Sequence, residues 1–202
     1  MVNERTVLEY LANLSWDARR LIPLKRERTV PRNIELKARL SSIDRARKVA
    51  EGLATDILPD QYQVDTYFRC PTGRLKLREI YSINAELIWY LRDDLKGSKE
   101  SRYEIVSVEH PTPIKKLLAA AYGVLIVVDK RRSIVLHNWV RIHLDQVAGL
   151  GDFIEFEAVL ADHQQDDEGH RIVEQLALTF GLRPEDRLAG SYSDLLARRS
   201  GG

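Results

Sequence analysis

The stretch Gly73-Arg74-Leu75-Lys76-Leu77-Arg78 alternates strictly between basic and apolar side chains. In an extended strand, successive side chains point to opposite faces, so Arg74, Lys76 and Arg78 share one face and the two leucines share the other. Taken alone, the stretch is typical of a half-buried strand whose charges lie in water. A second interpretation is that the three cations line a concave surface that holds a polyanion. Other strands decide between the two, through matching bases and through acids that could hold a metal.

Two further stretches repeat this alternation, with acids among the bases. In Asn33-Ile34-Glu35-Leu36-Lys37-Ala38-Arg39-Leu40, every odd-numbered residue is polar or charged and every even-numbered residue is apolar. In the stretch 153–158, Glu155 and Glu157 share one face. The stretch 140–145 adds three polar residues on one face, which are Arg141, His143 and Asp145. Several strands therefore carry acids and bases on one face and apolar residues on the other.

The order of the predicted elements favours an α+β fold. Strands are expected over 33–40, 73–78, 86–92, 102–108, 124–128, 133–136, 140–145 and 153–158, and helices over 4–20, 42–57, 111–122 and 166–180, with a short helix from Ser193. Connections such as 80–86, 137–139 and 146–152 are short, so the sheet is mainly antiparallel. An open sheet would leave the charged faces in water. A curled sheet would turn them into a lumen, where the desolvated charges would need a charged ligand.

The composition of the chain limits where in the cell the protein is expected and which partners it is expected to bind. The 202 residues suffice for one domain with a sizeable core. The charges of the 31 basic and 30 acidic residues nearly cancel, so the chain lacks the excess of basic charge that a non-specific nucleic-acid binder has. We expect no specific nucleic-acid partner either. Cys70 is the single cysteine, which excludes an intramolecular disulfide and indicates a reducing compartment. No stretch approaches the ~18 apolar residues of a membrane span, and the polar start is unlike a signal peptide. We expect a cytoplasmic protein with no membrane partner.

Several motifs follow one another in an order that resembles a known family. Asn33-Ile34-Glu35-Leu36-Lys37 resembles the Glu-x-Glu-x-Lys signature of the CYTH family, also called triphosphate tunnel metalloenzymes. The other matching motifs are Asp65-Thr66-Tyr67-Phe68, Gly73 to Arg78, Lys130-Arg131-Arg132, Gly149-Leu150-Gly151-Asp152-Phe153, Glu155-Phe156-Glu157 and Ser191-Tyr192-Ser193-Asp194-Leu195-Leu196. The resemblance predicts a CYTH domain at 31–197, after an N-terminal helical extension at 1–30 and before a tail at 198–202. The Leu-Gly-Asp-Phe turn and the last motif look most like class IV adenylate cyclases.

The resemblance implies an antiparallel, closed or nearly closed β-barrel of about eight strands, with the charged faces inward and helices packed outside. It also implies an enzyme that uses Mg²⁺ or Mn²⁺ and acts on ATP, thiamine triphosphate or tripolyphosphate. The first expectation is an adenylate cyclase that turns ATP into cyclic AMP and pyrophosphate. A triphosphatase, which uses water in place of the ribose 3′ hydroxyl, is the alternative. A non-catalytic nucleotide or polyphosphate binder is a third hypothesis, and a homodimer is left open.

The resemblance assigns roles to the charged residues as well. A triphosphate spreads about four negative charges over oxygens that accept from Arg and Lys. The implied triphosphate-binding residues are Lys37, Arg74, Lys76, Arg78, Arg92, Arg102, Lys130 and Arg132. The implied catalytic residues are Lys37, Arg132 and Asp145.

Carboxylates are the implied metal ligands, because magnesium and manganese prefer hard oxygen atoms. The family pattern places Glu35, Glu155 and Glu157 in this role. Asn33 stands where the signature has its first Glu, and its amide oxygen can coordinate a metal but adds no negative charge. The sequence therefore leaves open whether one metal or two are bound. His143 is either a proton carrier or a hydrogen-bonded structural residue.

Overall fold

The fold is that of a computed structural model, which describes residues 32–81, 83–92, 101–161 and 163–200. For Arg32, Arg92, Ser101, Arg102, Tyr103 and Ser200 it describes the backbone alone. The predicted helical extension at 1–30 therefore lies outside the described residues, as do the last two residues of the predicted tail. Within these ranges, no helix combines the length and the apolar character that crossing a membrane requires.

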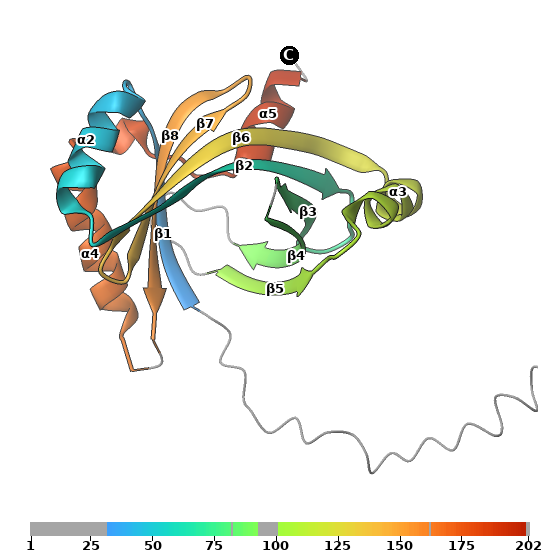
Figure 1. Cartoon of the computed structure of the whole chain (residues 1–202), viewed down its shortest axis with the longest axis horizontal. Helices are drawn as coiled ribbons and strands as arrows, with labels where there is room; N and C mark the ends of the chain where they lie inside the picture. The colour runs from blue at the N-terminus through green and yellow to red at the C-terminus, as the bar shows by residue number, and fades with distance from the viewer. Residues whose placement is uncertain (1–31, 82, 93–100, 162, 201–202) are drawn as a thin grey trace, which may run out of the picture.

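Eight strands form one antiparallel sheet. They are β1 (Arg32–Arg39), β2 (Asp56–Phe68), β3 (Arg74–Ile80), β4 (Asn84–Arg92), β5 (Ser101–Ser107), β6 (Val124–His137), β7 (Val140–Val147) and β8 (Gly151–Leu160). Their order across the sheet is β1-β8-β7-β6-β2-β3-β4-β5. The sheet curls until its edge strands, β1 and β5, approach each other (Figure 1). No β-bridge joins these two edges in the described part of the chain, so the result is an open half-barrel.

The helices lie outside the curl. They are α2 (Ile43–Leu53), α3 (Pro111–Tyr122), α4 (Asp166–Thr179) and α5 (Tyr192–Ser200), with a short 3₁₀ turn, η2 (Pro184–Asp186). As Figure 1 shows, α2 and α4 cover the convex side of the sheet near β1, β7 and β8. Helix α3 lies against β2 and β3, and α5 packs beside β6. The α+β class, the antiparallel sheet of about eight strands and the external helices are as predicted, but β2 is not among the individually predicted strands.

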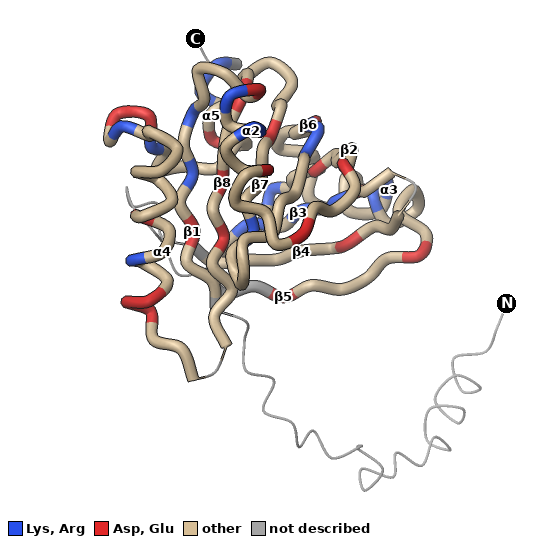
Figure 2. The backbone as a smooth tube through the Cα atoms, turned by 60° about the vertical axis from the view of Figure 1, so that its left-hand side comes forward, with Lys and Arg blue, Asp and Glu red and all other residues tan. Residues whose placement is uncertain are grey.

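The alternation in the sequence decides which side chains face the hollow. On β1, every second residue is apolar and belongs to the main core beneath α2 and α4. The residues between them, Asn33, Glu35 and Lys37, face the concave side. Strand β8 does the same with Glu155 and Glu157, and the register sets Glu35 opposite Glu157 and Lys37 opposite Glu155. Both signs of charge are therefore distributed along the strands of the curl (Figure 2).

The prediction of a helix through residue 57 is wrong. Helix α2 begins after the Ser42 cap, whose hydroxyl accepts from the Arg45 N–H at 3.3 Å, and it ends at Leu53. The chain then turns directly into β2, with Pro59 inside the strand. The β2–β6 register shifts between Leu58 and Gln61, and proline is tolerated at such an irregularity because no ladder hydrogen bond needs its missing N–H. This proline therefore marks a break in pairing and not the end of a helix.

Two predicted strands, 124–128 and 133–136, form a single strand in the structure. Strand β6 runs unbroken from Val124 to His137. The basic run between the two apolar segments does not form a loop, because Lys130 and Arg132 point into the hollow while Arg131 between them is exposed outside. The predicted helix 111–122 and its Gly123 C-cap are confirmed; Gly123 has a φ of 73°, which glycine adopts without strain.

Candidate functional site

The concave face of the sheet bounds a cavity of about 420 Å³. Side chains from the strands of the curl and from the segment entering α5 line it. Eight of the predicted site residues are among them: Glu35, Lys37, Lys76, Arg78, Lys130, Arg132, Glu155 and Glu157. The curl therefore gathers most of the predicted residues into one space.

Of the remaining four predicted residues, the two whose side chains are described, Arg74 and Asp145, do not line this cavity. Asp145 is completely buried behind Arg132. Arg74 lies toward α5 and forms an ion pair with Asp194 at 3.0 Å. The side chains of Arg92 and Arg102 are outside the described part of the chain. Arg74 is thus placed at the α5 end of the basic strand and away from the centre of the hollow.

One side of the cavity, here called the basic wall, consists of Asp65 on β2, Lys76 and Arg78 on β3, and Lys130 on β6. Arg78 binds the Asp65 carboxylate through two hydrogen bonds of 2.8 and 2.9 Å. The Lys76 Nζ lies 3.0 Å and the Lys130 Nζ 3.7 Å from the same carboxylate. Burial alone would raise the pKa of Asp65, but Arg78, Lys76 and Lys130 hold it well below its usual value. One ionised acid therefore serves three cations.

This shortage of acids changes the lysines of the basic wall. Burial, together with the neighbouring Arg78, lowers the pKa of Lys76 to about 8, although Asp65 opposes the shift. Burial and Arg132 lower the pKa of Lys130 well below its usual value. The Lys76 Nζ also lies 5.5 Å from the centre of the Tyr67 ring, and this cation–π contact partly compensates for the loss of hydration. Both lysines would hold their charge more firmly next to an additional anion.

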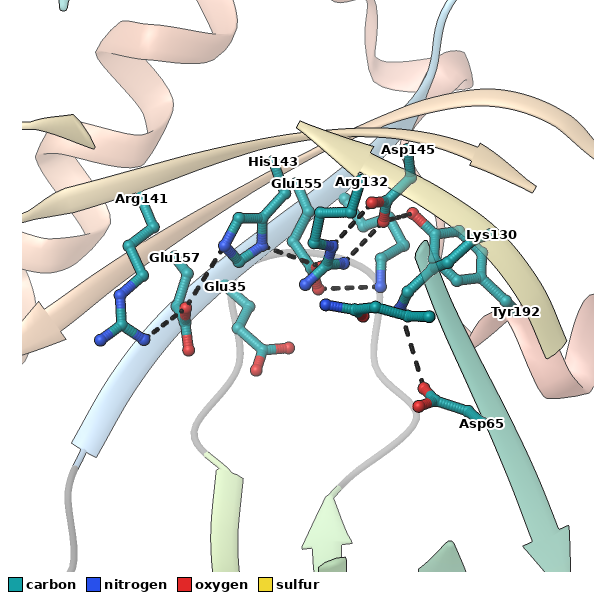
Figure 3. Close-up of polar contacts among 12 residues, drawn as sticks. Glu35, Asp65, Lys130, Arg132, Arg141, His143, Asp145, Glu155, Glu157 and Tyr192 are labelled. Carbon is teal, nitrogen blue, oxygen red and sulfur yellow. Dashed lines mark hydrogen bonds and ion pairs between the residues drawn. The ribbon is translucent and has the colours of Figure 1, made fainter. Parts of the chain in front are cut away.

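The opposite side is here called the acidic wall. Figure 3 shows its residues Glu35 on β1, Arg132 on β6, Arg141, His143 and Asp145 on β7, and Glu155 and Glu157 on β8. Lys37 on β1 also belongs to it. Arg132 donates to Asp145 through two hydrogen bonds of 2.7 and 2.6 Å, and to Glu155 at 2.7 Å. Lys37 forms an ion pair with Glu155 at 2.8 Å. Tyr192 of α5 donates its hydroxyl to Asp145 at 2.8 Å. Arg132 is thus fixed from both sides by buried carboxylates.

Two acids of this wall, Asp145 and Glu155, stay ionised. Burial would raise the pKa of Asp145, but Arg132 and Lys130 hold it well below its usual value. Burial likewise opposes ionisation of Glu155, and Lys37, His143 and Arg132 outweigh it. Burial and Arg132 lower the pKa of His143, so its imidazole is neutral at neutral pH. A neutral imidazole can accept a proton.

Divalent metal ions fit the part of the acidic wall around Glu35 and Glu157. The Asn33 side-chain N–H donates to Glu157 at 2.6 Å and to Glu35 at 3.5 Å. The Asn33 amide oxygen is buried and has no hydrogen-bond partner among the described residues. These are hard oxygen donors of the kind that Mg²⁺ and Mn²⁺ prefer. Within the described ranges, no group of three His, Cys, Asp or Glu side chains is arranged to hold a metal ion by itself.

Glu155, the third predicted metal ligand, is engaged differently. Its carboxylate is held by Lys37 and Arg132 and faces His143 at 3.5 Å. Glu157 is contacted by Arg141 at 3.2 Å at the edge of the wall, by Asn33 at 2.6 Å and by the His143 Nε2 at 3.9 Å. The structure therefore separates the two glutamates of one motif into an inner residue that orders cations and an outer residue closer to Glu35.

Sequence reasoning left two cavity residues without a role. Asp65 belongs to a matching motif, and its place two residues before Tyr67 puts both on the same face of β2. Gln63, two residues further back, faces the cavity for the same reason and is 2% exposed. The period of the strand could have identified both residues. The partners of Asp65 could not be predicted, because they depend on the register between β2, β3 and β6.

The chain belongs to the CYTH domain family, whose model matches residues 31–192. Members of this family are adenylate cyclases or triphosphatases that act on triphosphates and generally use divalent metals. Adenylate cyclase CyaB of Aeromonas hydrophila is 27% identical over 177 residues, which are 80% of this chain and 87% of that protein.

Solved structures agree with the family assignment. The PH1012 protein of Pyrococcus horikoshii is similar with a TM-score of 0.72 and 27% identity, over 81% of this chain and 98% of that one. HpAC1 of Hippeastrum, a protein with a dominant triphosphatase activity, is similar with a TM-score of 0.60 over 84% of this chain and 96% of that one. At 15% identity, the second likeness shows the fold alone.

Proposed function

We propose that this protein is a metal-dependent adenylate cyclase that converts ATP into cyclic AMP and pyrophosphate in the central cavity. The observation that carries the proposal is the pairing of two unlike walls. The basic wall has three cations around Asp65, and the acidic wall offers Glu35 and Glu157 across the same space. A triphosphate bound to a divalent metal has the complementary charges. The similarity to an adenylate cyclase favours this reaction among those of the family.

The triphosphate is held by cations of both walls. Arg78 and Arg132 each bind a carboxylate through two hydrogen bonds and would offer their remaining guanidinium N–H groups to phosphate oxygens, and Lys76, Lys130 and Lys37 would supply point charges. Bound phosphate oxygens would supply the negative charge that the basic wall lacks. We include Arg74, Arg92 and Arg102 in this set as predictions from the family pattern.

The metal, Mg²⁺ or Mn²⁺, would be held by Glu35 and Glu157 with the amide oxygen of Asn33, and Glu155 remains a predicted fourth ligand. When bound, it supplies positive charge that stabilises the phosphoryl oxygens during the reaction. Asn33 brings no charge, so a single metal agrees better with the described donors than two.

The chain's own residues orient the reacting groups. Asp145 holds Arg132 by two hydrogen bonds, so that its remaining N–H groups point toward Glu155 and the cavity. Lys37 lies beside them and is the third predicted catalytic residue. In the cyclase reaction, the ribose 3′ oxygen bonds to the α-phosphorus and pyrophosphate leaves, so the hydroxyl must lose a proton. His143 is neutral and lines the cavity, and we assign to it the uptake of this proton.

A triphosphatase is the second candidate. Its chemistry needs the same phosphate-binding cations, with water as the attacking group, and the similarity to HpAC1 favours it at the level of the fold. A non-catalytic nucleotide or polyphosphate binder is the third, and Asn33 is its motivation.

Product analysis separates these functions. The full chain is incubated with ATP, thiamine triphosphate or tripolyphosphate and with Mg²⁺ or Mn²⁺, and the products are separated by chromatography. A cyclase yields cyclic AMP and pyrophosphate from ATP, whereas a triphosphatase releases orthophosphate. Glu157→Gln should lower either turnover by at least about tenfold, since it removes a charge from the metal site. Glu185→Gln, which changes an exposed glutamate of η2, should leave turnover unchanged. Binding of the triphosphates without turnover of any of them would refute the enzyme proposal.

A further inference from the structure

Gln63 has a buried polar atom that the triphosphate chemistry does not use. The side chain is 2% exposed and lines the cavity. Its N–H group donates to the Gln61 side-chain oxygen at 2.5 Å, while its own amide oxygen has no hydrogen-bond partner among the described residues. A buried amide oxygen without a donor is costly, and such atoms occur where a ligand or water completes the site. Gln63 therefore offers an acceptor to a ligand in the cavity.

The surroundings of Gln63 are apolar on the side away from the basic wall. Its register neighbours are Ile80 on β3 and Lys130 on β6, and five residues back along β2 the register sets Leu58 opposite Ile134. All three apolar side chains line the same cavity. On its other side, Gln63 lies two residues from Asp65 on the same face of β2, about 7 Å along the strand. The glutamine thus stands between an apolar surface and the cations.

The position of α5 decides in which direction the organic part of a triphosphate extends. At that end of the cavity, Ser191 and Tyr192 are 5% and 4% exposed, and Tyr192 packs against Phe153. These packed side chains bound the cavity toward α5. With the phosphates at Lys76, Arg78 and Lys130, we therefore place the bulky group on the other side, across Gln63 and beside the apolar residues.

We propose that Gln63, held in orientation by Gln61, and the apolar residues Leu58, Ile80 and Ile134 form the subsite for the organic group, and that this subsite selects a planar ring with an amino donor, as in adenine. The proposal rests on the proposed function. It concerns the organic group of the substrate, because the charged walls bind the triphosphate and cannot distinguish one organic group from another. An acceptor on Gln63 suits the 6-amino group of adenine and disfavours a ring that carries a carbonyl oxygen there. The reverse amide orientation of Gln63 would bring two carbonyl oxygens together at the Gln61 contact.

Inosine triphosphate is the sharpest probe, since it has a carbonyl in place of that amino group and a proton on the neighbouring ring nitrogen N1. Binding of ATP, inosine triphosphate and tripolyphosphate to the full chain is measured by calorimetry with EDTA present, so that no turnover intervenes. The wild-type protein should bind ATP about tenfold more tightly than inosine triphosphate, as expected for one buried hydrogen bond. Gln63→Met should bring the two affinities within about twofold and leave tripolyphosphate binding unchanged.

Two further variants control this result. Gln63→Glu keeps only acceptor atoms and should preserve the preference for ATP, while its charge weakens binding of all three ligands. Gln146→Leu changes an exposed glutamine of β7 and should alter nothing. Equal binding of ATP and inosine triphosphate by the wild-type protein, or a preference that survives in Gln63→Met, would overturn the subsite while tripolyphosphate still binds. Absence of tripolyphosphate binding both with EDTA and with Mg²⁺ would instead overturn the proposed function itself.

Discussion

The two walls of the cavity are built from the same strand pattern but differ in how their charges are compensated. On the basic wall, one carboxylate, that of Asp65, contacts all three of Lys76, Arg78 and Lys130. On the acidic wall, Arg132 has two carboxylates, and Glu157 and Glu35 lie beyond them. The first wall lacks negative charge and the second lacks positive charge. This difference shows how a protein with a net charge of +1 can hold a metal-bound polyanion: it separates charges within one hollow.

The largest expected effect comes from removing the cation that joins the acidic wall. Arg132→Met leaves Asp145 and Glu155 buried without their main partner, and it should lower the free energy of unfolding by about 3–5 kcal/mol. Urea denaturation measures this. The matched control is Arg141→Met, whose exposed ion pair with Glu157 is worth about 0–1 kcal/mol. An equal loss of unfolding free energy in the two variants would show that a buried ion pair of this wall stabilises the fold no more than an exposed one.

Asp65→Asn tests the basic wall in the same way. The three cations lose their shared anion, and the free energy of unfolding should fall by about 2–4 kcal/mol. Because bound phosphate replaces the lost charge, tripolyphosphate should raise the melting temperature of this variant by more than it raises that of the wild type. Differential scanning calorimetry with and without tripolyphosphate measures both. A smaller ligand-induced rise in Asp65→Asn would contradict the view that this wall needs a second anion.

The basic wall should also respond to pH. Lys76, with a pKa of about 8, loses its charge as pH rises above that value, so tripolyphosphate affinity should fall by up to about tenfold per pH unit from pH 8 upward. Calorimetric titrations between pH 7 and 9 check this, and Lys76→Arg should reduce the slope because arginine stays charged. A wild-type affinity that is constant over this range would refute the expectation.

The sign for stability is opposite to that for binding. The folded-state pKa of Lys76 lies below its unfolded value, so keeping the lysine charged in the fold costs stability below pH 8. That cost is relieved as pH rises from about 8 toward the unfolded pKa of about 10.4. The contribution of Lys76 to the free energy of unfolding should therefore increase over this window. Urea denaturation at several pH values measures it, because the increase should be absent in Lys76→Met.

The smallest effect concerns the contact between α5 and the acidic wall. Tyr192→Phe removes one hydrogen bond to Asp145, which keeps its two bonds from Arg132. The free energy of unfolding should fall by about 1 kcal/mol. A loss as large as that of Arg132→Met would show that Tyr192, and not Arg132, holds the buried carboxylate in place.

Much of this site could be predicted from local patterns. Period two along β1, β3 and β8 identifies Glu35, Lys76 and Glu155 as residues of one face, and the order of motifs supports the curl. The sequence could not show that Glu155 binds Lys37 and Arg132 while Glu157 stays near Asn33, because this depends on register between strands far apart in the chain. The end of α2 was mispredicted because Pro59 marks a shift in pairing with β6, which only the partner strand reveals.

The central claim, that alternate residues of each strand face one polyanion-binding hollow, is tested most directly by a pair of adjacent residues. Lys130 and Arg131 carry the same charge on β6, but Lys130 lines the cavity and Arg131 is exposed on the outer face. Tripolyphosphate binding is measured by calorimetry for Lys130→Met and Arg131→Met. We predict that Lys130→Met weakens binding by at least about tenfold and that Arg131→Met changes it by less than about twofold. Equal weakening in both variants, or no binding by the wild type, would contradict the account.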